Sequence, residues 1–223
     1  MSLSVKQSSP YVLWGSAGHA KVLASAISLV GGNVAALFDN NVSSKPSLPG
    51  VPLIFGESGF IQWVESKASI SDYSGLVAIG GCRGLERIGL QKLMEKAGVR
   101  IGNLVHPSAS VCVSATIGKG TQILAQAVVS SDVVIGESCI INHCASVDHE
   151  CILGNGVHLA PRATLCGCVH VGDRVFVGAG ATIIPRINIG AGAIIGAGAV
   201  VIRDVAENSV MVGNPARFLQ KTI

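Results

Sequence analysis

Residues 117–153 read IGKGTQ-ILAQAV-VSSDVV-IGESCI-INHCAS-VDHECI-L when they are written six at a time, and each group opens on an aliphatic residue. The same spacing holds without exception over a longer stretch, in which every sixth residue is Ile, Leu or Val. The series is Val105, Val111, Ile117, Ile123, Val129, Ile135, Ile141, Val147, Leu153, Leu159, Leu165, Val171, Val177, Ile183, Ile189, Ile195 and Val201. A period of six matches neither a helix nor the alternation of an ordinary strand. It is typical of a parallel β-helix, in which each hexad supplies one short strand and one corner.

A second register of mostly small residues lies two positions before each aliphatic one from Val111 onward. It comprises Ala109, Ala115, Thr121, Ala127, Val133, Cys139, Ala145, Cys151, Val157, Ala163, Val169, Val175, Ala181, Ile187, Ala193 and Ala199. Small residues are expected there, because large aliphatic side chains already fill most of the interior of a three-sided prism. Three hexads form one coil, so the pattern predicts between five and six coils.

Residues 1–104 predict a different domain. Strands are expected at residues 11–14, 33–38 and 76–79, and helices at about 18–30 and 84–97. Strands that alternate with helices are typical of a small parallel α/β sheet. We therefore divide the chain into a Rossmann-like domain (1–104), a β-helix (105–209) and a C-terminal tail (210–223).

A glycine-rich turn, Gly15-Ser16-Ala17-Gly18-His19, joins the first predicted strand to the first helix. Such a turn can present backbone N–H groups to an anion such as a phosphate. The full dinucleotide-binding fingerprint needs a third glycine, whereas this turn stops at G-x-x-G. A tight turn without a ligand explains the same residues, and both interpretations remain open.

Polar side chains concentrate in one part of the repeat, residues 141–151, and at His158. His149 and Gly167 are eighteen residues apart, so they are expected at the same corner on successive coils, about one strand spacing apart. His149 would then be a general base, with Glu150, Asp148 or Asn142 orienting its ring. The alternative is a corner histidine beside solvated acidic groups. His143, six residues earlier, is expected on another face and cannot converge with His149 within one chain.

Seven residues of metal-ligand type occur in the same region, namely Cys144, His149, Cys151, His158, Cys166, Cys168 and His170. They contain neither a C-x-x-C nor an H-x-x-x-H pair, so no metal is expected. Zinc held by residues of two subunits, as in a hydratase built on the same prism, remains an alternative.

The composition restricts the possible partners. Only 13% of the residues are charged and the mean hydropathy is +0.55, which favours an oligomer whose outer faces pack together. The net charge of +3 does not favour nucleic-acid binding. We expect no membrane insertion, because uninterrupted apolar runs are short. The N-terminal residues lack the features of a secretory signal, so we expect a cytoplasmic protein with seven free thiols.

Three features together carry a family resemblance: Gly15-Ser-Ala-Gly-His-Ala-Lys-Val22 with the hexads, Asp148-His-Glu-Cys151 with His158, and Val212-Gly-Asn-Pro-Ala-Arg217. The chain resembles bacterial sugar acyltransferases of the hexapeptide-repeat family, the group of the sialic acid O-acetyltransferases and the nucleotide-linked amino-sugar N-acetyltransferases. The resemblance implies a left-handed β-helix and a homotrimer. It also implies that acetyl-CoA lies between two prisms and that the nucleotide of the sugar binds to the N-terminal domain.

The resemblance also implies residue roles. His149 is the general base and Glu150 its partner, and Asn142 contacts the substrate. His158 and Gly167 belong to the acetyl-CoA site, where the Gly167 N–H meets the thioester carbonyl. The residues that contact the nucleotide are Gly15, Ser16, Gly18, His19 and Asp39. Many members of this family carry Asp or Asn directly after the strand at 76–79. This chain has Gly81-Cys82 there, so the resemblance assigns no nucleotide contact to this loop.

The unbroken hexads add one inference about the acceptor. They leave no room for the long loop that covers the acceptor in many hexapeptide transferases, so the N-terminal domain must hold it, which favours a nucleotide-linked sugar. We expect an acetyl-CoA-dependent N-acetyltransferase in which the sugar amine attacks the thioester directly. The alternatives are O-acetylation of a sialic-acid-type sugar and, outside acyl transfer, a metal-dependent hydratase or a non-catalytic trimeric scaffold.

Overall fold

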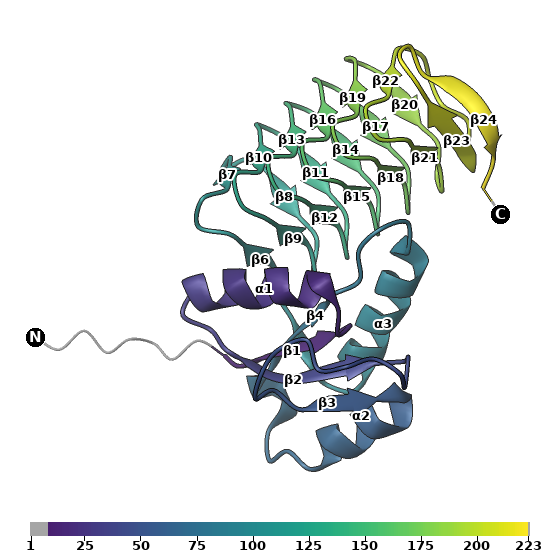
Figure 1. Ribbon diagram of the computed structural model, residues 1–223. Coiled ribbons are helices and arrows are strands. Elements are labelled where there is room, and N and C mark those ends of the chain that lie inside the picture. Colours follow the sequence, from purple (N-terminus) through teal and green to yellow (C-terminus); the bar gives the residue numbers. More distant parts are fainter. Residues whose placement is uncertain (1–8, 223) are drawn as a thin grey trace, which may run out of the picture. The chain divides into compact units, whose positions relative to one another are not determined.

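The computed structural model describes residues 9–222, which form two compact units (Figure 1). The first unit comprises the described residues up to Ile79 together with Leu90–Gly102. The second comprises Gly80–Gly89 and the described residues from Asn103 onward. Within the described part of the chain, no helix has the length and apolar character needed to cross a membrane.

The first unit is built on a five-stranded parallel sheet in the order β3-β2-β1-β4-β5. Its strands are β1 (Tyr11–Trp14), β2 (Val34–Asp39), β3 (Leu53–Phe55), β4 (Ser74–Val77) and β5 (Arg100–Ile101). The chain runs outward from β1 to β3 and then returns to place β4 on the other side of β1. In such sheets ligands bind beyond the carboxyl ends of the strands where the order reverses, which here lies between β1 and β4.

The first unit contains the helices α1 (Gly18–Leu29) and α2 (Gly56–Glu65) and a short 3-10 turn η1 (Ile70–Asp72). It also contains the part of α3 (Gly84–Lys96) from Leu90 onward, whereas the first residues of α3 belong to the second unit. An aromatic cluster of Trp14, Phe38 and Phe60 forms the centre of the core, with ring centroids 5.0 to 5.7 Å apart. The three predicted strands and both predicted helices are present, although β4 ends at Val77 and not at Ile79. The sequence did not indicate β3 or α2, because β3 has three residues and α2 buries only Phe60 fully.

The second unit is a three-sided prism of short parallel strands (Figure 1). From β6 to β19, each strand pairs with the strand three further along the chain. The strands are β6 (Leu104–Val105), β7 (Ser110–Val111), β8 (Thr116–Ile117), β9 (Gln122–Ile123), β10 (Val128–Val129), β11 (Val134–Ile135), β12 (Ile140–Ile141), β13 (Ser146–Val147), β14 (Ile152–Leu153), β15 (His158–Leu159), β16 (Thr164–Leu165), β17 (His170–Val171), β18 (Phe176–Val177), β19 (Thr182–Ile183), β20 (Asn188–Ile189), β21 (Ile194–Ile195) and β22 (Val200–Val201). Each strand ends on one aliphatic residue of the six-residue series, as the sequence predicted. A hairpin of β23 (Ser209–Val212) and β24 (Arg217–Lys221) extends the sheet that contains β21.

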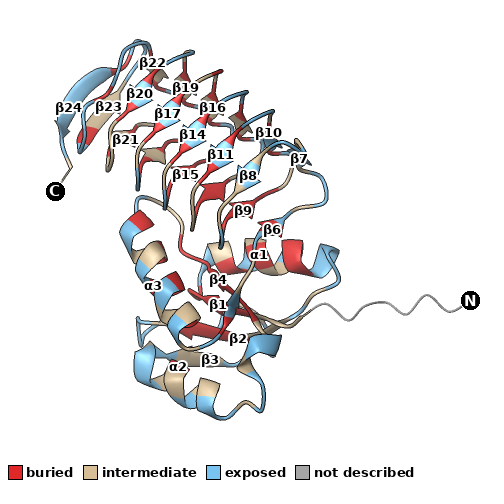
Figure 2. Ribbon diagram, turned by 180° about the vertical axis from the view of Figure 1, so that it is seen from behind, coloured by how far each residue is buried: buried red, intermediate tan, exposed pale blue. Residues whose placement is uncertain are grey.

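The interior of the prism holds both predicted registers (Figure 2). Cys139 and Cys151 are fully buried there and serve as small core residues. The first aliphatic residue is an exception, because Val105 is 36% exposed and does not belong to this core. Val111 and Ile117 are only partly buried. The prediction of an unbroken buried series is therefore wrong at its first member, which has no preceding coil of the repeat to cover it.

The corners contain a regular backbone feature that positions the functional side chains. Every sixth residue from Gly120 to Gly198 has a φ between 56° and 71°, in the left-handed region, and most of these residues are not glycine. Glu150 and Cys168 are two of them. The glycines that directly follow aliphatic residues serve another purpose: a methyl group at Gly118 or Gly136 would lie 2.5 or 2.7 Å from the backbone of the next coil. These glycines therefore permit the coils to stack closely.

Arg87 ties the segment 80–89 to the prism within the second unit. The guanidinium is 1% exposed and donates from Nε to the Ser138 carbonyl (3.1 Å) and from Nη2 to the Gly156 carbonyl (2.6 Å). Its Nη1 donates to the Gly81 carbonyl at 3.3 Å. Burial lowers the pKa of Arg87 to about 10, so the group stays charged at neutral pH. The loop that contains Gly81 is thereby held against the prism.

Candidate active site

His149 and Glu150 form a hydrogen-bonded pair at the corner between β13 and β14. His149 Nδ1 lies 3.0 Å from Glu150 Oε2, and the two side chains are 51% and 63% exposed. An ionised carboxylate only accepts hydrogen bonds, so Nδ1 must carry the proton of this bond. In the neutral ring Nε2 is then left unprotonated. The pair can therefore accept a proton at Nε2, as a general base requires.

The surroundings of Glu150 keep its carboxyl group ionised. The hydrogen bond from His149 and a second one from the Cys168 thiol lower the pKa of Glu150, and the positive charge of Arg186 acts in the same direction. The neighbouring Asp148 has another role, since its Oδ1 accepts the His149 backbone N–H at 2.8 Å. Of the three orienting groups that the sequence left open, Glu150 is the one that contacts the ring.

Gly167 lies directly against the His149 imidazole, one coil further along. A methyl group at Gly167 would be 2.5 Å from Nε2 and 2.6 Å from Cε1, so only glycine leaves room for the ring in this position. Gly167 is buried, and its N–H donates to none of the described residues. Buried backbone N–H groups are normally paired, so one without a partner beside a basic nitrogen suits a carbonyl oxygen of a ligand.

Asn142 and His158 form a second polar group. Asn142 Nδ2 donates to His158 Nε2 at 3.2 Å, and the Gly81 carbonyl accepts from His158 Nδ1 at 3.2 Å. The imidazole is 5% exposed, and its ring meets Phe176 at a centroid distance of 5.2 Å. These contacts fix the neutral tautomer with the proton on Nδ1. The sequence did not indicate that Gly81 would reach His158.

The two polar groups lie on opposite sides of the prism. His149 lies at the corner where the sheet containing β13 meets the sheet containing β14, whereas His158 belongs to β15 in the third sheet, and Asn142 follows β12 in that same sheet. In a three-sided prism a corner is opposite the third side. A single chain therefore does not bring all the predicted prism residues together. His143 lies at the corner between β12 and β13, apart from His149, as predicted.

In the first unit the predicted nucleotide-binding residues meet around the turn after β1. Asp39 Oδ2 accepts the Ser16 backbone N–H at 2.9 Å, and the Ser16 hydroxyl donates to the Lys45 carbonyl at 2.9 Å. Gly15 has a φ of +116°, and a methyl group there would lie 2.5 Å from the Ala78 carbonyl oxygen. Gly18 is different, since a methyl group there would meet nothing within 4 Å. The backbone at Gly18 is thus open to a ligand, whereas Ser16 is engaged within the protein.

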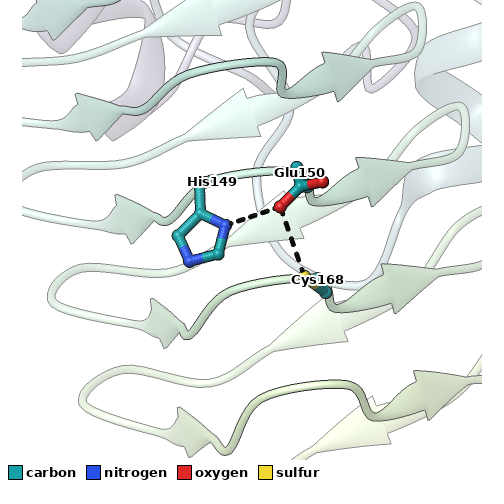
Figure 3. Close-up of side chains that lie close together, drawn as sticks. All are labelled: His149, Glu150 and Cys168. Atoms are coloured by element: carbon teal, nitrogen blue, oxygen red, sulfur yellow. Dashed lines mark hydrogen bonds and ion pairs between the residues drawn. The ribbon is translucent and has the colours of Figure 1, made fainter.

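One group of side chains in the described residues could hold a metal ion. The ligand atoms of His149, Glu150 and Cys168 all lie within 4.8 Å of one another (Figure 3). The thiol of Cys168 lies 3.7 Å from Glu150 Oε2. Cys168 follows Glu150 by eighteen residues, so the spacing that related Gly167 to His149 would also have found this contact.

Known proteins share this architecture. A family model described as "Bacterial transferase hexapeptide (six repeats)" matches residues 114–149 and 150–185. PerB from Caulobacter crescentus, solved in complex with CoA and GDP-perosamine, is 36% identical, with a TM-score of 0.86 over 95% of this chain and 97% of that chain. A histidine-to-asparagine mutant of perosamine N-acetyltransferase from the same organism is 35% identical, with a TM-score of 0.87 and the same coverage. The acetyltransferase domain of PglB from Neisseria gonorrhoeae FA1090, in complex with acetyl coenzyme A, is 30% identical over 95% of this chain and 99% of that chain, with a TM-score of 0.83.

These similarities extend over nearly the whole chain and include both the parallel α/β sheet and the repeat. The prism is accordingly a left-handed β-helix, as the resemblance in sequence implied. From the repeat, the shared fold and the sequence identity, it follows that the chain belongs to the sugar acetyltransferases of the hexapeptide-repeat family and is an acyltransferase.

Proposed function

We propose that this protein transfers the acetyl group of acetyl-CoA to the amino group of a nucleotide-linked sugar. The observation that carries the proposal is the His149–Glu150 pair, whose Nε2 lies against Gly167 while Nδ1 is held by the carboxylate. The similarity to the Caulobacter enzyme, which was solved with CoA and GDP-perosamine, supports the two substrates. The alternative within acyl transfer is O-acetylation of a sugar hydroxyl group. No contact among the described residues favours a hydroxyl acceptor over an amine.

The geometry supports a direct transfer. The amine nitrogen attacks the thioester carbonyl carbon, a C–N bond forms, and the carbonyl electron pair moves onto oxygen. The Gly167 N–H donates to that oxyanion. His149 Nε2 takes the proton that the amine loses, and Glu150 stabilises the resulting imidazolium. Collapse of the intermediate breaks the C–S bond, and the CoA thiolate leaves with the proton from His149.

The first unit supplies the site for the nucleotide in this proposal. Its contacts involve the turn residues Gly15, Ser16, Gly18 and His19, and Asp39. Because Asp39 already places a carboxylate on the Ser16 N–H, it favours hydrogen-bond donors of the ligand, such as a ribose hydroxyl or a base N–H, over a phosphate at that point. The open backbone at Gly18, at the start of a helix that Ala17 does not cap, suits a phosphate instead.

A homotrimer would complete the site. Asn142 and His158 lie opposite the His149 corner of their own prism, so they can join His149 only if it comes from a neighbouring copy. Outward-facing apolar side chains support such packing, since Val128, Val134 and Ile152 are 41%, 43% and 47% exposed.

A groove supports the position of acetyl-CoA between two prisms. It has a volume of about 710 Å³ and runs beside β14, β17 and β20, where Ile152, His170, Asn188 and Glu207 line it. It begins at the strand that follows His149. The Gly167 N–H of the corner and His158 of the neighbouring copy would then belong to the acetyl-CoA site. We place the reaction in the cytoplasm, which the seven free thiols support.

The substrate proposal is tested by incubating the protein with acetyl-CoA and nucleotide-linked sugars that carry either an amine or a hydroxyl group at the same carbon. We expect CoA release and a mass increase of one acetyl group for the amino sugars alone. Acetylation of the hydroxyl sugars alone would contradict N-acetylation and favour the O-acetyltransferase alternative.

The shared site is tested by subunit mixing. We expect His149→Ala and Asn142→Ala homotrimers each to lose most of their activity. Co-expressed in equal amounts, the two chains should regain about a quarter of the wild-type activity, because that fraction of sites combines an intact His149 with an intact Asn142 of the next copy. No recovery in a verified mixed trimer would show that both residues act from the same chain.

A further inference from the structure

The corner that holds His149 carries a third ligand atom, which the acetyl transfer described above does not use. Glu150 and Cys168 have nearly the same left-handed backbone conformation, with φ of 58° and 60°, one coil apart. Their side chains therefore leave the corner side by side, and the Cys168 sulfur faces the carboxylate that also binds His149 (Figure 3). Nitrogen, oxygen and sulfur thus converge at one exposed point.

These three atoms match the ligand preferences of zinc. Zinc takes imidazole nitrogen and carboxylate oxygen at about 2.1 Å and thiolate sulfur at about 2.3 Å, in a tetrahedral arrangement whose ligand atoms lie about 3.4–3.6 Å apart. Here Nδ1 and Oε2 are 3.0 Å apart, and Sγ and Oε2 are 3.7 Å apart. The nitrogen and the sulfur lie within 4.8 Å. Closing that last distance needs a movement of about 1 Å, which side chains that are half exposed can make.

We propose that His149 Nδ1, Glu150 and Cys168 bind Zn²⁺ reversibly, and that the bound ion inhibits acetyl transfer. The Cys168 thiol loses its proton to solvent when the Zn–S bond forms. The metal replaces the proton on Nδ1, so the proton of the neutral ring moves to Nε2. Nε2 then changes from an acceptor into a donor and cannot take a proton from the amine.

The metal binding and its consequence depend on different observations. Binding rests only on the three ligand atoms. Inhibition rests in addition on the proposed function, in which Nε2 of His149 is the base. The positive charge of Arg186, which acts on Glu150, opposes a further cation and favours weak, reversible binding over a permanently held ion.

Binding is tested on the full-length protein after chelation and removal of the chelator. Zn²⁺ is titrated by calorimetry, and Co²⁺ serves as a spectroscopic probe, because a bound thiolate gives a sulfur-to-cobalt charge-transfer absorption. The test variant is Cys168→Ser, and the matched control is Cys144→Ser. Cys144 is also an exposed corner thiol, with φ 57°, but it lies at a different corner. We expect Cys168→Ser to lose the absorption and weaken zinc binding by at least about tenfold, and Cys144→Ser to change neither.

Inhibition is measured as the initial rate of each variant with Zn²⁺, relative to the rate of the same variant without metal. Initial rates are used because the thiol of released CoA also binds zinc. We expect Zn²⁺ to inhibit the parent and Cys144→Ser at similar concentrations, and Cys168→Ser at concentrations at least about tenfold higher. An absorption that is missing from the parent, or retained in Cys168→Ser, would overturn the metal site. A Cys168-dependent absorption without inhibition would establish the site, overturn the inhibition and argue against His149 as the base.

Discussion

Replacement of Gly167 by alanine is the most direct test of the geometry around His149. The φ of Gly167 is not in the left-handed region, so the backbone accepts alanine, and the three atoms nearest to the new methyl group all belong to the His149 imidazole. It would lie 2.5 Å from Nε2 and 2.6 Å from Cε1, where ordinary contact begins at 3.4 Å. The ring must therefore move by about 1 Å. A displacement of that size in a catalytic group lowers turnover by about 10²-fold, so we expect a loss of that order.

The assay is kcat at saturating concentrations of both substrates, together with thermal unfolding. Because the ring is half exposed and can turn away, we expect Gly167→Ala to keep its fold and a Tm near that of the parent. Gly89→Ala is the control, since a methyl group there meets nothing within 4 Å. If the displaced ring is the cause, the double variant Gly167→Ala/His149→Ala should be little worse than His149→Ala alone. Near-normal turnover of Gly167→Ala would refute the placement of the base against this glycine.

The other predictions concern separate parts of the molecule. His149→Ala should lower kcat by ~10²–10⁴ while leaving the protein folded. His143→Ala should cost far less, because its side chain has no assigned role in the transfer; equal losses would count against His149 as the base. Gly18→Val places a branched side chain at the open backbone of the turn, so it should raise KM for the nucleotide sugar and leave KM for acetyl-CoA unchanged; an equal rise in both constants would count against a nucleotide site there. Arg87→Met removes the hydrogen bonds to two buried carbonyl groups and should lower the free energy of unfolding by about 2–5 kcal/mol in urea titrations. An unchanged midpoint would show that these hydrogen bonds contribute little. Hydrogen bonds from neighbouring serines lower the pKa of Cys112 to about 7, whereas burial raises the pKa of the core thiols Cys139 and Cys151 to about 11. Iodoacetamide at pH 7 should therefore alkylate Cys112 first. Mass spectrometry of the peptides checks the order, and earlier reaction of a core thiol would contradict the prediction.

Much of the second unit follows from the sequence because its contacts are periodic. Stacked coils place residue i beside residue i+18, so the six-residue spacing predicts the strands, the two buried registers and the position of Gly167 against His149. The same rule would have found Cys168 beside Glu150. The pattern does not predict the exposure of Val105, because an aliphatic residue of the series is fully covered only when coils stack on both sides of it. The first hexad has a coil on one side only.

The contacts that do not repeat were decided by the tertiary structure. Arg87 reaches carbonyls 51 and 69 residues away, and no spacing in the chain relates them. The spacing alone left Glu150, Asp148 and Asn142 open as partners for the His149 ring, and only the family resemblance pointed to Glu150. The left-handed backbone at Glu150 turns its carboxylate to Nδ1, Asp148 instead accepts a backbone N–H, and Asn142 faces His158 on the opposite side. Composition and spacing thus determined which residues share a corner, whereas the direction of each side chain depended on backbone angles that only the folded chain fixes.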